Sequence, residues 1–146
     1  MENTNATTTK NKKIKLDFKD SKYATGRRKK SIARVWVKKG SGNIHVNGLK
    51  MNEYFKRPVH QIIVTRPLEI TEATNNYDIK CSVKGGGLSG QAGAIILGIS
   101  KALIAHDVSM KKNLKKDKLT TRDSRVVERK KYGHRKARRS FQFSKR

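Results

Sequence analysis

The sequence has little with which to build a disulfide, a zinc site or a membrane anchor. Only one of its 146 residues is a cysteine, Cys81, and only two are prolines. A lone cysteine excludes an internal disulfide framework and a cysteine-based zinc site. The longest uncharged stretch, Gly85 to Ser100, is rich in glycine and shorter than the ~18 apolar residues expected of a membrane span. The N-terminus has neither an apolar signal core nor a transit-peptide pattern, so we expect a soluble, intracellular protein.

Acidic residues are also scarce. The chain has 11 Asp and Glu against 36 Lys and Arg, a formal net charge of +25. Residues 1–39 hold 13 basic and 3 acidic side chains and residues 111–146 hold 16 and 3, whereas residues 40–110 hold 7 and 5. So high a charge opposes compaction unless a polyanion neutralises it. The pattern predicts a nearly neutral folding unit with two cationic arms, and nucleic acid as its partner.

Hydrophobic periodicity outlines the folding unit. We expect a disordered extension at residues 1–22, a globular domain at 23–107 and a basic tail at 108–146. Tyr77–Lys84 alternates cleanly and predicts a strand, and 91–106 has the apolar spacing of a helix. The remaining predictions are a strand at 32–37, a hairpin in which 44–47 returns beside it, and a short helix at 49–55, with strand and helix both open for 59–70.

The three glycines after that predicted strand invite a nucleotide-binding interpretation. Gly85-x-Gly87-x-x-Gly90 stands between strand and helix, as a dinucleotide fingerprint does, and Gly85-x4-Gly90 resembles the start of a Walker A loop. Walker A requires Lys and then Ser or Thr, but Gln91 and Ala92 stand there. The Rossmann pattern requires a further strand after the helix, where the chain instead becomes basic. A tight strand-to-helix turn, whose free N–H groups could meet an RNA phosphate, fits better.

Little in the sequence suggests catalysis. The four histidines, His45, His60, His106 and His134, are scattered, and the few acids do not form an acid and base pair. Cys81 lies in a predicted strand and is expected to be a small buried side chain. We therefore expect no enzyme, no catalytic residue, no bound metal and no cofactor.

Basic clusters interleaved with aromatic residues are the strongest functional signal. Arg and Lys neutralise phosphates, and arginine planes and aromatic rings stack on unpaired bases. Tyr132, Phe141 and Phe143 lie among the clusters near the C-terminus. The predicted RNA contacts are Arg27, Arg28, Lys29, Lys30, Arg129, Lys130, Lys131, Arg135, Lys136, Arg138 and Arg139.

Three segments in order resemble the small-subunit ribosomal protein S9 family, in its bacterial or organellar form. They are YATGRRKKSIARVWVKKGSGNIHVNG, GGGLSGQAGAIILGISKAL and TRDSRVVERKKYGHRKARRSFQFSKR, within residues 23–146. Bacterial members commonly have proline where Phe141 stands. The resemblance implies a two-layer α/β (α+β) fold like the second domain of ribosomal protein S5, with helices on one face of a mixed sheet and a long basic C-terminal tail.

The resemblance also implies a function. It places the protein in the head of the small subunit, bound to small-subunit (16S-type) rRNA and neighbouring head proteins, with no membrane and no small-molecule substrate. The tail threads through the rRNA, so that Lys145 and Arg146 contact tRNA in the peptidyl site during translation. The implied location is the cytoplasm, in a bacterial ribosome, with a mitochondrial or plastid ribosome as the alternative. A free-standing RNA-binding module or chaperone is the rival interpretation, and a nucleotide-dependent enzyme is the third.

Overall fold

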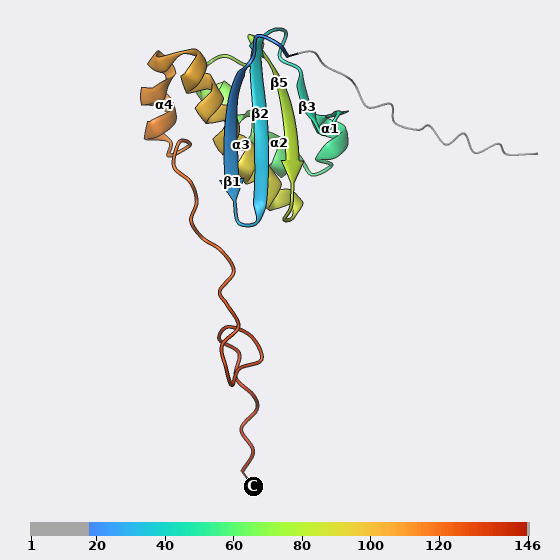
Figure 1. Ribbon diagram of the computed structural model, residues 1–146, viewed down its shortest axis with the longest axis vertical. Helices are drawn as coiled ribbons and strands as arrows, with labels where there is room; N and C mark the ends of the chain where they lie inside the picture. Colours follow the sequence, from blue (N-terminus) through green and yellow to red (C-terminus); the bar gives the residue numbers. More distant parts are fainter. Residues whose placement is uncertain (1–17, 146) are drawn as a thin grey trace, which may run out of the picture.

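The structure, a computed structural model, describes residues 18–145, so most of the predicted extension 1–22 and the terminal Arg146 lie outside the described residues (Figure 1). In chain order the elements are β1 Lys22–Arg28, β2 Ser31–Lys39, β3 Ile44–Val46, β4 Leu49–Lys50, α1 Met51–Tyr54, α2 Pro58–Ile70, β5 Tyr77–Lys84, α3 Leu88–His106, the 3-10 turn Val108–Met110 and α4 Lys111–Lys116. The fold is α+β, with a mixed five-stranded sheet, as predicted.

The sheet has the order β1-β2-β5-β3-β4. β2 pairs antiparallel with β1 and with β5, while β3 runs parallel to β5, with Ile44 opposite Ile79. The predicted hairpin between 32–37 and 44–47 is therefore wrong, because β5 lies between the two strands. The Asp78 side chain of β5 holds the loop between β2 and β3. Its Oδ1 accepts hydrogen bonds from the backbone N–H groups of Ser41 (3.0 Å) and Asn43 (2.9 Å).

Strict alternation separates the two faces of the sheet. Ala33, Val35 and Val37 of β2 are fully buried, and Ile79 and Cys81 of β5 lie beside them. Their neighbours along each strand point to the opposite, open face, because successive side chains of a strand alternate. The predicted strands at 32–37 and 77–84 are confirmed.

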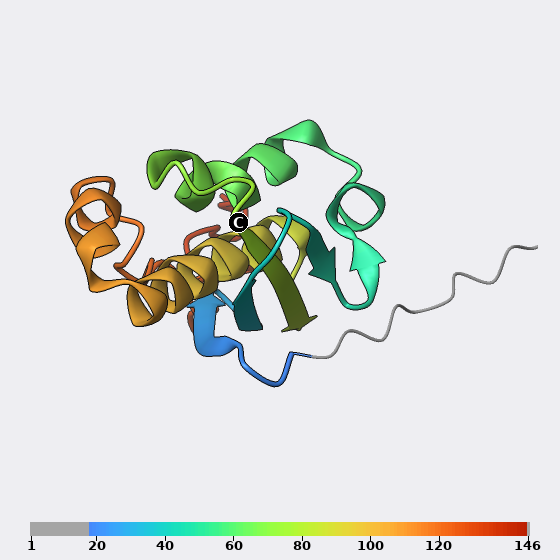
Figure 2. The ribbon, with the colours of Figure 1, turned by 90° about the horizontal axis from the view of Figure 1, so that it is seen from above.

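Helix α3 covers the inner face, and α2 packs on α3 from the same side of the sheet (Figure 2). The close approach of α3 to β1 and β2 requires glycine at the positions where they touch. A Cβ on Gly98 would lie 2.6 Å from Val35 Cγ2, and a Cβ on Gly26 of β1 would collide with the carbonyl oxygen of Ala94. Strand β1 was not predicted from the sequence, because Gly26 and the basic residues after it interrupt the alternation of apolar and polar residues.

The segment 59–70, left open by the sequence, is helical in α2. Pro58 begins the helix, where its missing N–H costs nothing. Pro67 lies inside the last turn and is buried with Val64 and Leu68 toward α3. Burial of this side explains why a broken apolar pattern still forms a helix.

By length and composition α3 could cross a membrane, with a mean hydropathy of 1.5, but 67% of that stretch is buried inside the domain, as in a core helix. Beyond α3 the chain stays packed on the domain, because Leu114 of α4 is fully buried and Leu119 is partly buried against the core. The boundary at residue 107 stays a prediction. Residues 120–145, the extended segment, form no helix and lead away from the domain (Figure 1).

Candidate nucleic-acid interface

The glycine turn between β5 and α3 has the geometry of a tight strand-to-helix connection. Gly85 (φ +74°) and Gly86 (φ +62°) adopt the left-handed conformation that side chains disfavour. The Ser31 hydroxyl donates a 3.0 Å hydrogen bond to the Gly85 carbonyl and fixes the turn against β2. Gly87 is the N-cap residue of α3 and faces open space.

A groove of about 620 Å³ lies over this turn. Three segments distant in sequence line it: the β1–β2 turn, the start of α3 and the beginning of the extended segment. The sequence-predicted contacts Lys29, Lys30 and Arg129 meet here. The other lining residues are Gly86, Gly87, Ser89, Gly90, Val126, Val127 and Glu128. Cations beside the N-terminus of a long helix give the groove the chemistry of a phosphate site.

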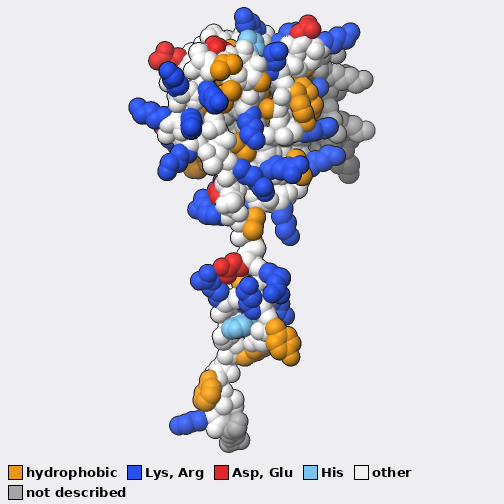
Figure 3. Space-filling view, turned by 60° about the vertical axis from the view of Figure 1, so that its left-hand side comes forward, with side chains coloured by type: hydrophobic (Ala, Val, Ile, Leu, Met, Phe, Trp, Pro, Cys, Tyr) orange, Lys and Arg blue, Asp and Glu red, His pale blue; other side chains and the backbone are white. Residues whose placement is uncertain are grey.

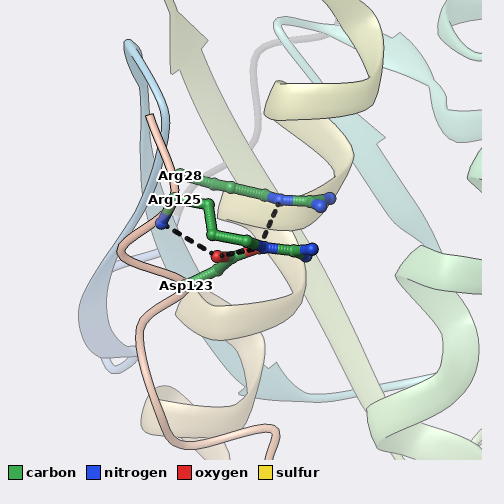
Figure 4. Close-up of polar contacts among 3 residues, drawn as sticks. All are labelled: Arg28, Asp123 and Arg125. Atoms are coloured by element: carbon green, nitrogen blue, oxygen red, sulfur yellow. Dashed lines mark hydrogen bonds and ion pairs between the residues drawn. The ribbon is translucent and has the colours of Figure 1, made fainter. Parts of the chain in front are cut away.

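Arg28 points toward the helix side of the sheet, where it lies against α3. Its aliphatic portion packs on Gly93 of α3, and its Nε lies 3.3 Å from Asp123 Oδ2. The side chain is about a quarter exposed, at 26%. Arg28 therefore anchors the start of the extended segment to the domain (Figure 4).

Asp123 is held by a second arginine as well. The Arg125 guanidinium donates to both carboxylate oxygens at 2.9 to 3.3 Å, and the Arg125 backbone N–H donates to Oδ1 at 3.1 Å. These bonds, with the charges of Arg125 and Arg28, hold the pKa of Asp123 well below its usual range. Asp123 is thus a carboxylate at every physiological pH. We call the contact of Arg28, Asp123 and Arg125 the Asp123 latch.

Further along, the extended segment folds back on itself in a small loop. Glu128 accepts two parallel hydrogen bonds from Arg138, at 2.8 and 2.9 Å, and the Arg135 backbone N–H donates to the Arg139 carbonyl at 2.8 Å. Arg138 lowers the pKa of Glu128. Lys130, Lys131 and Lys136 lie within this loop and are exposed. We call residues 128–139 the basic loop.

Aromatic side chains accompany the basic loop without being buried. Tyr132 is fully exposed and Phe143 is 87% exposed, while Phe141 lies under the Arg135 guanidinium, 5.3 Å from the ring centroid. Exposed rings among cations are typical of surfaces that stack on unpaired bases. Figure 3 shows Lys and Arg side chains over the domain and the extended segment, with few acidic groups between them.

Of the two terminal residues predicted to contact tRNA, the structure describes only the first. Lys145 is exposed and lies beyond the last aromatic residue of the chain. Arg146 lies outside the described residues. The tRNA contact of this pair therefore stays a prediction.

The cysteine and two of the histidines, which could in principle act in catalysis or bind metal, pack within the domain. Burial raises the pKa of the Cys81 thiol to about 12, so this cysteine is unreactive at neutral pH. His60 packs on the Phe55 ring and His106 on the Tyr77 ring, with centroids 5.8 and 5.1 Å apart. Within residues 18–145, no group of three His, Cys, Asp or Glu side chains could hold a metal ion.

Two parts of this interface were not predicted from the sequence. The Asp123 latch was missed because nothing local links Arg28 to a carboxylate 95 positions later. The cations on the open face of the sheet, Arg34 and Lys80 among them, were missed as a group. Strand alternation was the available signal, because it puts both on the outer side.

Comparison with known families gives a match over most of the chain. The model of a family described as ribosomal protein S9/S16 matches residues 26–146. The match spans the end of β1, the other four strands, α3, the glycine turn, the basic loop and the C-terminal end.

Proposed function

The chain belongs to the ribosomal protein S9 family, whose members are structural, rRNA-binding proteins of the small ribosomal subunit and not enzymes. From that premise we propose that its basic clusters contact small-subunit rRNA, and that Lys145 and Arg146 contact tRNA in the peptidyl site. The observation that carries the proposal is the family match, which continues to the last residue of the chain.

The groove over the glycine turn supports a phosphate contact. Lys29, Lys30 and Arg129 supply positive charge, and the open position at Gly87 lets a backbone approach α3. Such contacts position an RNA without reading its sequence. The single acid in the groove, Glu128, is already paired with Arg138 and is largely neutralised.

The length of the C-terminal end supports the tRNA contact. Beyond the basic loop, a fully extended chain from Arg139 to Lys145 adds at most roughly 20 Å, because each residue adds about 3.3 Å. Two cations can thus act far from the domain that carries them. Phosphate contacts at the anticodon stem-loop would hold every tRNA alike, as translation of all codons requires.

The test compares small subunits assembled with the full chain and with a chain that lacks residues 145 and 146. We expect assembly to persist, because Arg129 to Arg139 remain, and tRNA to dissociate faster. Each charge-assisted hydrogen bond that is removed accounts for about 1.5–3 kcal/mol at most, and less where water competes. The double variant K111A/K112A, which removes two exposed cations from α4, is the matched control for charge. Equal dissociation rates for all three subunits would contradict the tRNA contact.

The family also bears on where in a cell the protein acts. The family places the protein in a ribosome, of the cytoplasm or of an organelle. The Gln-Phe-Ser-Lys-Arg ending resembles that of the bacterial and organellar members alike, and we propose a bacterial cytoplasmic ribosome, with a mitochondrial or plastid ribosome as the alternative. Co-sedimentation with small subunits through high salt separates a resident protein from a free-standing RNA-binding module, because a loosely bound factor washes off.

A further inference from the structure

The open face of the sheet, turned away from α3, carries a surplus of positive charge. Residues paired directly across strands point to the same side, so the register identifies this face. Among the described strand residues one acid, Asp78, lies on this face, and its carboxylate accepts hydrogen bonds from the loop at Ser41 and Asn43. The cations of the open face are Arg27, Arg34, Lys38, Lys50, Lys80 and Lys84.

An aromatic platform lies on this face, over the edge strand β1 and its neighbour β2. Tyr23 on β1 is directly opposite Trp36 on β2, with ring centroids 5.3 Å apart. The Arg34 guanidinium lies 5.5 Å and the Lys80 ammonium 5.8 Å from the centroid of the Trp36 ring. Tyr23 keeps half of its surface exposed, at 50%. The platform is thus a pair of rings with cations around it.

This arrangement is not explained by the needs of the fold. Arg34 lies opposite Ser82 and diagonal to Lys84 on β5, so two like charges occupy neighbouring positions. Like charges at such positions repel each other. Exposed cation–π contacts offset only about 0.5–1 kcal/mol each. A polyanion on this face would remove the repulsion.

We propose that the open face is a separate RNA-contact surface, where an unpaired base stacks on the Tyr23 and Trp36 platform and phosphates pair with Arg34 and Lys84. The inference rests on the proposed rRNA binding and adds a surface to it. RNA fits better than an acidic protein segment, because rings and cations together match the bases and phosphates of a single strand.

Trp36 is the only tryptophan of the chain, so tryptophan emission, excited at a wavelength that tyrosine does not absorb, reports on this face alone. The experiment titrates the full chain with a short oligouridylate and follows tryptophan emission and, in parallel, total binding by anisotropy of the labelled RNA. We expect RNA to quench the tryptophan emission in a saturable way. The quenching should occur over the same range of RNA concentration as part of the total binding. Inorganic polyphosphate, which has no base, should bind with much weaker quenching.

Two variants test the residues. R34A/K84A should weaken the quenching transition and reduce its salt slope by about 1.4, because each phosphate neutralised on a single strand adds about 0.7 to that slope. K111A/K112A removes the same charge from α4 and should leave the quenching transition in place. Thermal unfolding checks that both variants are folded.

The outcomes separate the two proposals. RNA that binds the full chain without quenching Trp36, and with equal affinity for R34A/K84A and K111A/K112A, overturns the open-face surface and leaves rRNA binding intact. Failure of the full chain to bind RNA at all overturns the proposed function itself. Quenching by an oligoglutamate peptide but not by RNA would assign the face to an acidic protein instead.

Discussion

The domain and the extended segment differ in what their side chains contact. In the domain, apolar side chains from β2, β5, α2 and α3 close around one core. In residues 120–145, Val127 is 85% exposed and Tyr132 is fully exposed. The ion pairs between described residues all involve the two acids of the extended segment, Asp123 and Glu128.

The difference has a physical consequence. Apolar burial persists in salt, whereas exposed ion pairs are screened and contribute little to stability. RNA phosphates can compete for the same arginines. We therefore expect substitutions in the domain to change unfolding, and substitutions in the extended segment to change RNA binding while the domain stays intact.

The largest expected effect is on the contact between α3 and the sheet. Gly98→Val would push a branched side chain into Val35 and the β1 backbone, since a Cβ alone already approaches Val35 Cγ2 to 2.6 Å. We expect a loss of about 3 kcal/mol in the free energy of unfolding, measured by denaturant titration. Lys101→Val, at an exposed position of the same helix, is the control and should cost less than about 1 kcal/mol. Similar stability of the two variants would contradict the close packing of α3.

A smaller effect on stability is expected at the glycine turn, where the neighbouring residues Gly86 and Gly87 should differ in their tolerance of alanine. Gly86→Ala should cost about 1–2 kcal/mol, because φ is +62° and the new methyl group would collide with Ser31 Oγ. Gly87→Ala has a negative φ and open space, so its melting temperature should stay within a degree or two. If Gly87→Ala nevertheless weakens RNA binding, a phosphate approaches this position; equal RNA binding would place the RNA elsewhere in the groove.

The sequence sufficed for the elements whose pattern is local. β5 and α3 carry clear periodicity, and the glycine turn is where the sequence put it. The pairing of β3 was not local. It depends on Asp78 accepting hydrogen bonds from a loop more than thirty residues earlier, so proximity in sequence favoured the wrong neighbour, β2.

The candidate site shows the same division. Basic clusters are visible in any composition count, but the availability of an individual arginine to RNA depends on whether an acidic partner already binds it. Arg28 and Arg138 are paired with Asp123 and Glu128, whereas Lys29 and Lys30 line an open groove. Only the folded chain distinguishes the anchoring arginines from the cations available to RNA.

In the extended segment, the first expected effect is on the Asp123 latch. Asp123→Asn should lower the melting temperature only slightly, because the pair with Arg125 is exposed and only the pair with Arg28 is partly buried. It should increase the rate of tryptic cleavage at Arg125 and Arg129 several-fold, because the start of the segment is no longer held to β1 and α3. Lys112→Ala is the control for a surface change. Cleavage as slow as in the unchanged protein would show that the latch does not hold the segment.

The pH dependence of the latch has a defined sign. The pKa of Asp123 is lowered in the folded state, so its contribution is present above the ordinary carboxyl pKa of about 3.9 and is lost as the pH falls through the lowered value. Amide hydrogen exchange of residues 122–126 should therefore show constant protection factors from pH 5 to 8. Protection that changes over that range would indicate a different titrating group.

The smallest expected effect concerns the basic loop, where Glu128→Gln removes a carboxylate from among cations. The Arg138 guanidinium, now bound by two hydrogen bonds to Glu128, would become available to a phosphate, so RNA affinity at low salt should rise slightly. The slope of log affinity against log salt should steepen by about 0.7 to 0.9, which is one phosphate contact. Glu72→Gln, a domain carboxylate outside the groove and the open face, controls for the change in net charge. A fall in affinity would mean that the Glu128–Arg138 pair shapes the loop for RNA, and that its ordering outweighs the charge it neutralises.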